Sequence, residues 1–354
     1  MGTSDPLRVA VVGYGLAGSV FHAPLIAAVP GLQVAAVVTG SAERAAAARA
    51  RYPGVTVLSD ADTLFADPSA VDLVVVAAPN AAHVPLARRA VAAGLPVVVD
   101  KSLAATAAEA AALVAEARAA GVLLVPYHNR RWDGDFLTLR GLVENGTLGR
   151  LVRFESRFER YRPQVQHERW RESGDPAAGG GLLLDLGPHL VDQALVLFGA
   201  PTAVYAEVGR ARFGAAVDDD VFVALTYADG PRVHLWASMA APVPAPRFRV
   251  NGLDGGFEVF GLDPQEAALR DGGVPGDPGW GVDDRTGTLT GDADTAVPLQ
   301  PGAYERFYEG VRDAVVDGAA PPVDAADAVL GLRVLEAARR SADTGTVVPF
   351  EEAP

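Results

Sequence analysis

Short uninterrupted apolar runs alternate with alanine-rich segments over the first 126 residues. The runs, rich in valine and leucine, stand at Leu7–Val12, Leu32–Thr39, Leu73–Ala78, Pro96–Val99 and Val122–Val125. Runs without polar alternation suit strands that are buried on both faces of a parallel sheet. The intervening segments predict helices at Ala42–Tyr52, His83–Ala93 and Thr106–Ala120. This succession predicts a doubly wound α/β domain over residues 1–126.

The pattern changes after about Tyr127. Apolar and polar positions now alternate, which predicts strands with one solvated face. These strands are expected at Leu151–Tyr161, Ala203–Phe213, Val221–Tyr227, Arg232–Ser238, Arg247–Asn251 and Gly256–Phe260. Helices are expected at Asp133–Glu144, Leu186–Phe198, Tyr304–Val316 and Ala325–Ser341, and a long surface excursion at Asp263–Thr295. Residues 127–354 are therefore predicted to form an α+β domain with a large, mainly antiparallel open sheet.

Composition narrows the classes of function. The formal net charge of −14 argues against nucleic acid or an anionic membrane as a partner. The absence of cysteine excludes disulfides, cysteine-based zinc sites and thiol nucleophiles. The first apolar run is too short for a signal or membrane helix, so a cytoplasmic protein is expected. Arginine carries nearly all the positive charge, and Lys101 is the single lysine.

A glycine-rich hexapeptide follows the first predicted strand and leads into a helical pattern. Its residues are Gly13, Tyr14, Gly15, Leu16, Ala17 and Gly18. In a Rossmann domain the first glycine permits the tight turn and the second lets backbone amides approach the pyrophosphate. The third allows close packing of helix on strand. This context predicts a dinucleotide-binding turn; the alternative is a glycine turn that holds no ligand.

The end of the second predicted strand bears on the choice of cofactor. An acidic residue that binds the ribose hydroxyls of NAD is missing there, and Thr39, Ser41 and Arg44 stand in its place. Without a carboxylate to repel a 2′-phosphate, NADP(H) is preferred and NAD(H) remains possible. The alternative is that Thr39 and Ser41 only cap the next helix and that Arg44 is solvated.

Two further strand ends supply polar residues to the same edge of the sheet. Pro79 and Asn80 follow the fourth run and His83 opens the next helix, either as cofactor contacts or as a capped turn. Lys101 ends the fifth run, where its ammonium could bind a substrate oxygen beside the nicotinamide and stabilise a developing alkoxide. Because arginine replaces lysine elsewhere, a lone lysine at this edge indicates a specific chemical requirement.

The second constellation runs from Gly179 to His189. Asp185 is expected to cap a helix, and His189 lies in the first turn of that helix. The positive end of the helix dipole disfavours imidazolium, which suits a general base, and Asp185 could orient the ring. The alternative is a histidine that only packs at a helix start.

Metal binding and serine hydrolysis find little support. Asp185, His189 and Asp192 are conceivable ligands, with His167 and Glu168 elsewhere, but no HExxH helix, cysteine cluster or acidic calcium loop is present. No Gly-x-Ser-x-Gly elbow is present either. We expect no metal.

Taken together, the glycine fingerprint, Pro79-Asn80, Lys101 and the Asp-x-Gly-x-His motif of residues 185–189 resemble the Gfo/Idh/MocA oxidoreductase family over essentially the whole chain. Finer segments resemble its NADP-dependent scyllo-inositol dehydrogenases and their uncharacterised relatives: residues 13–25, 128–133, 161–163 and 169–171. One departure is Ser102, where the family commonly has proline after the lysine.

The resemblance implies Lys101, Asp185 and His189 as the catalytic trio. It also implies association into homodimers or homotetramers through the open sheet faces of the second domain. We expect hydride transfer between the nicotinamide and a secondary alcohol or ketone of a cyclic polyol or sugar. In this mechanism Lys101 polarises the oxygen in the interdomain cleft, His189 takes the proton and Asp185 orients it.

His128, Arg131 and Trp132 follow the sixth run and are expected to help line the substrate pocket. Trp132 could equally be a core residue, and Arg131 a surface ion-pair partner. Two other functions stay open at this point. One is a sugar hydrolase or isomerase that uses tightly bound NAD transiently; the other is a non-catalytic dinucleotide sensor.

Overall fold

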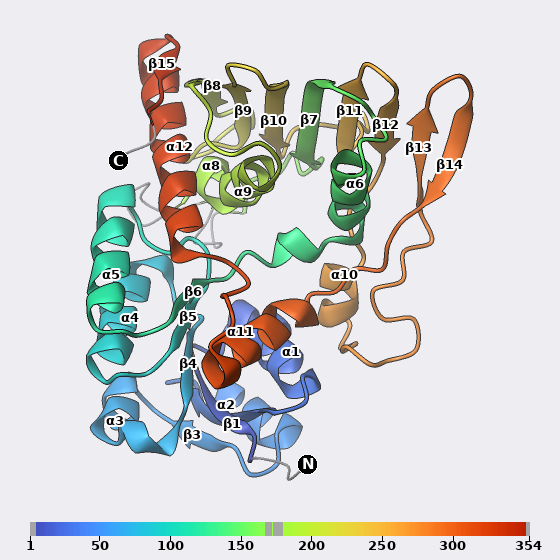
Figure 1. The fold of residues 1–354 in the computed structure, drawn as a ribbon. Helices are drawn as coiled ribbons and strands as arrows, with labels where there is room; N and C mark the ends of the chain where they lie inside the picture. Colours follow the sequence, from blue (N-terminus) through green and yellow to red (C-terminus); the bar gives the residue numbers. More distant parts are fainter. Residues whose placement is uncertain (1–4, 167–171, 173–179, 352–354) are drawn as a thin grey trace. The chain divides into compact units, whose positions relative to one another are not determined.

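The structure, a computed structural model, describes residues 5–166, 172 and 180–351 (Figure 1). His167, Glu168, the 169–171 segment and Gly179 lie outside the described residues. The chain divides into two compact units. The N-terminal unit comprises Met1–Trp132, Pro264–Gly281 and Ala303–Ala328, and the C-terminal unit comprises Asp133–Asp263, Val282–Gly302 and Val329–Pro354. The C-terminal half thus contributes two segments to the N-terminal unit.

The N-terminal unit is built on a six-stranded parallel sheet with the strand order β3-β2-β1-β4-β5-β6. Its strands are β1 (Leu7–Val12), β2 (Leu32–Val38), β3 (Thr56–Leu58), β4 (Leu73–Val76), β5 (Val97–Val99) and β6 (Leu124–Pro126). The predicted doubly wound sheet is confirmed. Only the short β3 escaped prediction, because this edge strand is exposed or half-buried and lacks the fully buried run of the equally short β5 and β6.

Helices complete this unit. They are α1 (Ala23–Ala28), α2 (Ala42–Arg51), α3 (Ala61–Ala66), α4 (His83–Ala92), α5 (Ala107–Ala119), α10 (Gln265–Arg270) and α11 (Glu305–Asp317). The late helices α10 and α11 belong here because their apolar side chains enter the same core as strands β1 and β4. Leu269, Phe307, Tyr308 and Val311 pack in that core.

The C-terminal unit is built on a nine-stranded sheet with the order β14-β13-β12-β11-β7-β10-β9-β8-β15. Its strands are β7 (Leu151–Glu159), β8 (Ala203–Gly209), β9 (Asp220–Thr226), β10 (Arg232–Ser238), β11 (Phe248–Gly252), β12 (Gly256–Val259), β13 (Thr286–Thr290), β14 (Asp294–Pro298) and β15 (Val348–Pro349). Neighbouring strands are antiparallel except β10 and β7. The predicted mainly antiparallel sheet is confirmed.

Helices cover one face of this sheet, as Figure 1 shows. They are α6 (Gly134–Glu144), α8 (Leu182–Asp185), α9 (Gly187–Phe198) and α12 (Ala325–Thr344). Alternate residues of β9 and β10, such as Val223 and Leu235, face these helices and are buried. Their neighbours Phe222 and Trp236 lie on the opposite face and are only partly buried.

The expected long surface excursion at Asp263–Thr295 is only partly confirmed: residues 271–285 are irregular and mostly exposed or half-buried, but regular elements lie on either side. Helix α10 and strand β13 occupy parts of it, and β14 begins within it. Strands β13 and β14 form a hairpin at the end of the sheet. Most of their residues are exposed or half-buried, so the hairpin lacks the apolar alternation that reveals the central strands.

No helix within the described ranges is long and apolar enough to cross a membrane.

Candidate functional site

The glycine turn after β1 leaves open space only where a ligand would need it. Gly13 has a φ of 96°, and a Cβ there would lie 2.5 Å from the carbonyl oxygen of Ala77. A Cβ on Gly18 would collide with the carbonyl oxygen of Gly13. At Gly15 a Cβ would meet only the Nη1 atom of Arg44, at 3.7 Å. The first and third glycines thus serve packing, and the space beside Gly15 fits the close approach of a dinucleotide.

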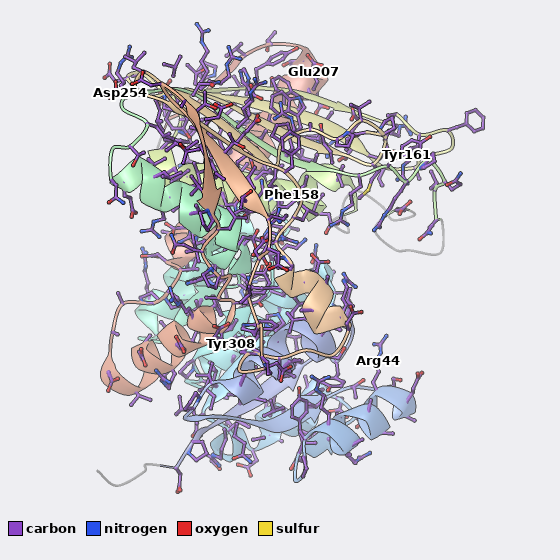
Figure 2. All side chains as sticks on the ribbon, turned by 90° about the vertical axis from the view of Figure 1, so that its right-hand side faces the viewer. Arg44, Phe158, Tyr161, Glu207, Asp254 and Tyr308 are labelled. Carbon is purple, nitrogen blue, oxygen red and sulfur yellow. The ribbon has the colours of Figure 1, made fainter. Side chains whose placement is uncertain are left out.

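The end of β2 is organised by two hydroxyl groups. Thr39 Oγ1 accepts a hydrogen bond from the Ser41 amide at 3.3 Å, and Ser41 Oγ accepts one from the Arg44 amide at 3.3 Å. Ser41 is thereby the N-cap of α2, which orients Arg44 in the first helical turn. Figure 2 shows Arg44 on the outside of the N-terminal unit. Among the described residues its guanidinium makes no ion pair, so it is available to an anionic ligand.

His83 connects the ends of two neighbouring strands. Pro79 and Asn80 begin the 3-10 turn that follows β4, and His83 starts α4 with 1% of its surface exposed. Its Nδ1 lies 2.7 Å from the carbonyl oxygen of Ser102, and its Nε2 lies 2.8 Å from that of Ala78. The ring therefore ties the segment after β4 to the segment that carries Lys101. A direct contact of these residues with the cofactor stays a prediction.

Lys101 lies just beyond the end of β5 and is half-buried. The amide of Asp100 donates to the carbonyl oxygen of Val76 on β4, which continues the ladder to the strand end. Asp100 Oδ1 then accepts a hydrogen bond from the Lys101 amide at 2.8 Å. The backbone of the lone lysine is thus held by the carboxylate that precedes it.

The buried side chain of His22 lies next to the Asp100 carboxylate, and the sequence did not indicate this arrangement. His22 is fully buried; its Nδ1 lies 2.5 Å from the hydroxyl of Tyr308 and its Nε2 lies 3.8 Å from Asp100 Oδ1. The ring of Tyr127 lies 4.2 Å from the His22 ring, centroid to centroid. A histidine soon after the glycine turn was the available signal, but its partner Tyr308 is 286 residues away.

Burial and neighbouring charges shift the pKa values of Asp100, Tyr127 and Tyr308. Burial raises the pKa of Asp100, but the interaction with His22 and the charges of His83 and Lys101 outweigh burial, and the pKa is lowered. Burial, followed by the negative charge of Asp100, holds the pKa of Tyr127 well above its usual range. The same causes, with Tyr127 contributing, raise the pKa of Tyr308. The carboxylate stays ionised and both phenols keep their protons.

Of the three residues expected to line a substrate pocket after β6, Arg131 and Trp132 contact side chains of the N-terminal unit. Arg131 Nη2 donates to Asp327 Oδ2 at 2.8 Å. The Trp132 ring packs edge-on against Phe307, with centroids 5.9 Å apart. His128 has 7% of its surface exposed. Arg131 thus forms the ion pair, and Trp132 the packing contact, that the sequence left open as alternatives. Contact with substrate stays a prediction for all three residues.

Asp185 and His189 lie on successive short helices of the C-terminal unit. Asp185 is the last residue of α8, and Leu186 is the N-cap of α9, so the expected capping role of Asp185 is wrong. The reason lies elsewhere in the chain: Asp218 Oδ2 accepts the Leu183 amide at 2.7 Å and starts a helical turn before Asp185. His189 lies in the first turn of α9, as predicted, with 6% of its surface exposed.

Within each unit the predicted residues come together in part. The N-terminal unit brings Arg44 to the glycine turn and joins His83 to the Lys101 segment. The C-terminal unit places Asp185 four residues before His189 along nearly continuous helix. In the described parts of the chain, no three His, Cys, Asp or Glu side chains are arranged to hold a metal ion.

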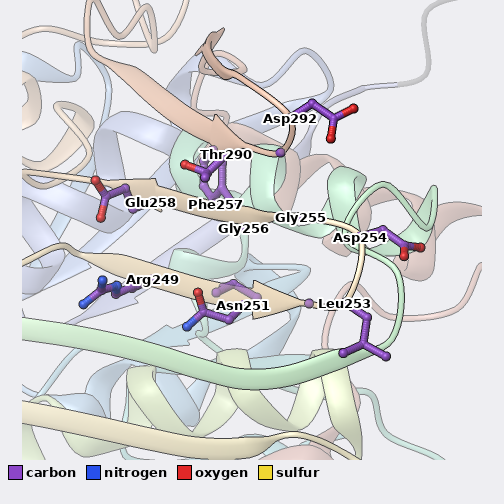
Figure 3. Close-up of a pocket in the computed structure, with 13 residues that line it drawn as sticks. Arg249, Asn251, Leu253, Asp254, Gly255, Gly256, Phe257, Glu258, Thr290 and Asp292 are labelled. Carbon is purple, nitrogen blue, oxygen red and sulfur yellow. The ribbon is translucent and has the colours of Figure 1, made fainter.

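A separate hollow of about 520 Å³ lies at the β11–β12 hairpin (Figure 3). Polar side chains and glycines surround it, among them Arg249, Asn251, Glu258 and Thr290. It contains none of the predicted catalytic residues and lacks the apolar lining typical of a small-molecule site. We assign it no role in chemistry.

Comparison with known proteins supports an oxidoreductase. Residues 7–128 match the family model described as "Oxidoreductase family, NAD-binding Rossmann fold", and residues 140–350 match "Oxidoreductase family, C-terminal alpha/beta domain". The chain is 42% identical over 344 residues to the uncharacterized oxidoreductase YdgJ of Escherichia coli, covering 96% of this chain and 97% of that protein.

Two further relatives extend the comparison. The scyllo-inositol 2-dehydrogenase (NADP(+)) IolW of Bacillus subtilis is 36% identical over 354 residues, covering 98% of this chain and 97% of that protein. The crystal structure of an oxidoreductase from Bacillus cereus matches with a TM-score of 0.88 at 30% identity, covering 98% of this chain and 99% of that one. The similarity thus extends over the whole fold.

Proposed function

The chain belongs to the Gfo/Idh/MocA oxidoreductase family, and on this premise we propose that it is an NADP-preferring dehydrogenase of cyclic polyols or sugars. The observation that carries the proposal is the position of Lys101. The lone lysine follows β5 at the edge of the sheet where the glycine turn follows β1. In open parallel sheets, ligands bind at the carboxyl ends of the strands.

The cofactor preference rests on Arg44 and on the hydroxyl groups of Thr39 and Ser41. The 2′-phosphate of NADP would add negative charge close to the end of β2, and a guanidinium is well suited to bind a phosphate. The similarity to an NADP(+)-dependent relative supports the same choice. NAD(H) would bind at the glycine turn without this additional contact.

The chemistry is proposed as follows. The nicotinamide of the bound dinucleotide supplies the hydride acceptor or donor. Lys101 donates a hydrogen bond to the substrate oxygen and stabilises the negative charge that develops on it. His189 removes the hydroxyl proton as a general base, and the Asp185 carboxylate orients the imidazole.

A panel of inositols, aldoses and their oxidised forms, offered with NADP and NAD, tests the proposal. Formation of reduced cofactor with at least one polyol is the expected result. Product formation without net reduced cofactor would replace this function by a transient-NAD hydrolase or isomerase. Cofactor binding with no turnover on any compound would indicate a sensor.

We also propose that the chain associates through the open sheet face, which we call the aromatic face: Arg157, Tyr205, Phe222, His234 and Trp236. The Phe222 and Trp236 rings lie 5.1 Å apart, and the Arg157 guanidinium lies 4.0 Å from the Trp236 ring centroid. Interfaces are enriched in aromatic residues and arginine. A face of this composition supports a homodimer or homotetramer.

A further inference from the structure

We propose that His22 and Tyr308 are positioning residues for Lys101, acting through the carboxylate of Asp100. The effect of these residues on catalysis rests on the proposed function. Its structural part concerns only the N-terminal unit, to which all four residues belong.

The first step is the cost of burying these groups. His22 and Tyr308 both have 0% of their surface exposed, and they lie among apolar side chains such as Val9, Ile26 and Phe307. Burying a polar group is unfavourable unless a partner replaces the hydrogen bonds it makes with water. Leucine and phenylalanine would fill the same space without that cost, so the two polar groups call for a role that uses their polarity.

The two buried side chains, His22 and Tyr308, are hydrogen-bonded to each other. Tyr308 keeps its proton because burial and the nearby negative charge raise its pKa. The phenol hydroxyl is hydrogen-bonded to Nδ1 of His22, across 2.5 Å. The other ring nitrogen, Nε2, faces Asp100 Oδ1 at 3.8 Å.

The third step connects the carboxylate to the lysine. Asp100 Oδ1 lies between the His22 ring and the backbone amide of Lys101, from which it accepts a hydrogen bond at 2.8 Å. The interaction with His22 lowers the pKa of Asp100 and so favours the ionised carboxylate, and this carboxylate holds the lysine backbone. It also places a negative charge beside the lysine side chain, since Lys101 contributes to lowering the Asp100 pKa. The position of the Lys101 backbone thus depends on the carboxylate that His22 contacts.

The charged and titratable groups around this carboxylate come from several elements. His22 precedes α1, His83 begins α4, Lys101 follows β5, Tyr127 and Arg130 follow β6, and Tyr308 lies on α11. Of these, His22 lies against the carboxylate and also bonds to Tyr308. Removing the Tyr308 hydroxyl changes that arrangement without altering any charge, which makes Tyr308→Phe the most specific probe.

The single lysine makes the inference measurable without turnover. Reductive methylation with ¹³C-formaldehyde labels only the Lys101 amine and the N-terminal amine, and the two dimethylamine signals titrate separately by NMR. In Asp100→Asn we expect the Lys101 signal to titrate about one pH unit lower than in the native chain, because a neighbouring negative charge is lost. Tyr308→Phe should shift it in the same direction by a smaller amount. Asp100→Glu should restore most of the native titration.

Kinetics on the unmodified enzyme supply the second readout. We expect kcat to fall about 10- to 100-fold in Asp100→Asn and about 3- to 10-fold in Tyr308→Phe, with KM for NADP within about threefold. Asp72→Asn is the matched control: it removes a carboxylate next to the start of β4 in the same sheet, where Asp72 binds Arg8. This control should change neither readout.

The outcomes separate the two proposals. An unchanged Lys101 titration and unchanged kcat in both Asp100→Asn and Tyr308→Phe would overturn the positioning role even in an active enzyme. Shifted titrations in a chain that oxidises no polyol would keep the positioning role and overturn the proposed function. If Asp100→Asn does not fold, Tyr308→Phe and Asp100→Glu carry the same test.

Discussion

The guanidinium of Arg44 lies beside Gly15, with Nη1 3.7 Å from the position that a Cβ would occupy on that glycine. This relationship joins the end of β2 to the turn after β1, and it is formed by the Ser41 cap that starts α2. A positive charge therefore stands next to the place where backbone amides approach a pyrophosphate. The pair is the structural feature on which the proposed preference for NADP rests.

Arg44→Ala tests this distinction. We expect the Kd for NADP to rise about tenfold or more, because a charge-assisted contact with the 2′-phosphate is lost. The Kd for NAD should change by less than about threefold, since NAD lacks that phosphate. Titration of each cofactor by protein fluorescence gives both constants. Equal losses for the two cofactors would contradict the proposed NADP preference.

Lys101→Met tests the role of the ammonium group. Methionine has a similar length without charge, so NADP should bind with a Kd within about threefold of the native value. Turnover should fall by about 10³-fold or more, because the substrate oxygen loses its electrostatic partner. Arg249→Met, on the separate hollow at β11–β12, serves as a control for loss of one exposed positive charge. Near-normal turnover in Lys101→Met would refute the assigned role.

His189→Asn tests the general base. The variant keeps a polar group in the first turn of α9 but cannot take a proton near neutral pH. We expect kcat to fall about 10²- to 10⁴-fold, with partial recovery at high pH where hydroxide replaces the base. A pH–rate profile of both proteins checks this. If the variant retained the acidic limb of the native profile, the base would have to be another residue.

His234 links the aromatic face to pH. Burial lowers the pKa of His234 below its usual 6.5, the charge of Glu155 opposes the shift, and Arg153, Arg157 and Arg232 lower the pKa further. Above pH 6.5 the ring is neutral in both folded and unfolded chains and has no effect. As the pH falls below 6.5, His234 binds a proton more readily in the unfolded chain than in the folded one, so folding stability is lost.

We therefore expect the thermal midpoint of the native chain to fall more between pH 7 and about pH 5 than that of His234→Gln. His234 stacks near Phe222 and Trp236, so protonation on the aromatic face should also weaken association. Sedimentation at both pH values measures the second effect. Identical pH dependence of native and variant would show that His234 does not contribute.

Helices and strands were predictable from sequence where burial of one face produces a regular repeat of apolar and polar residues. Strand β10 has the predicted bounds, Arg232–Ser238, because Val233 and Leu235 alternate with solvent-facing neighbours. The hairpin of β13 and β14 was not predictable, because backbone pairing at the edge of a sheet needs no apolar stripe. The return of α10 and α11 to the N-terminal unit was equally invisible in a linear pattern.

The candidate site was predictable where it depends on local sequence. The glycine turn and the end of β5 lie where the pattern placed them. The features that were missed depend on long-range partners. Asp218 starts α8 from 35 residues beyond Leu183, which displaces Asp185 from the expected cap. Tyr308 reaches His22 from the far end of the chain. Pairing between distant side chains leaves no periodic trace in one sequence.

The most direct test of the central claim is the formation of NADPH by the native chain from a panel of inositols and aldoses, measured by absorbance beside Lys101→Met. We expect polyol-dependent NADPH formation in the native chain and none above background in the variant, with both proteins folded and binding NADP. NADPH formation at equal rates in the two proteins would contradict it, as would a native chain that binds NADP and oxidises no member of the panel.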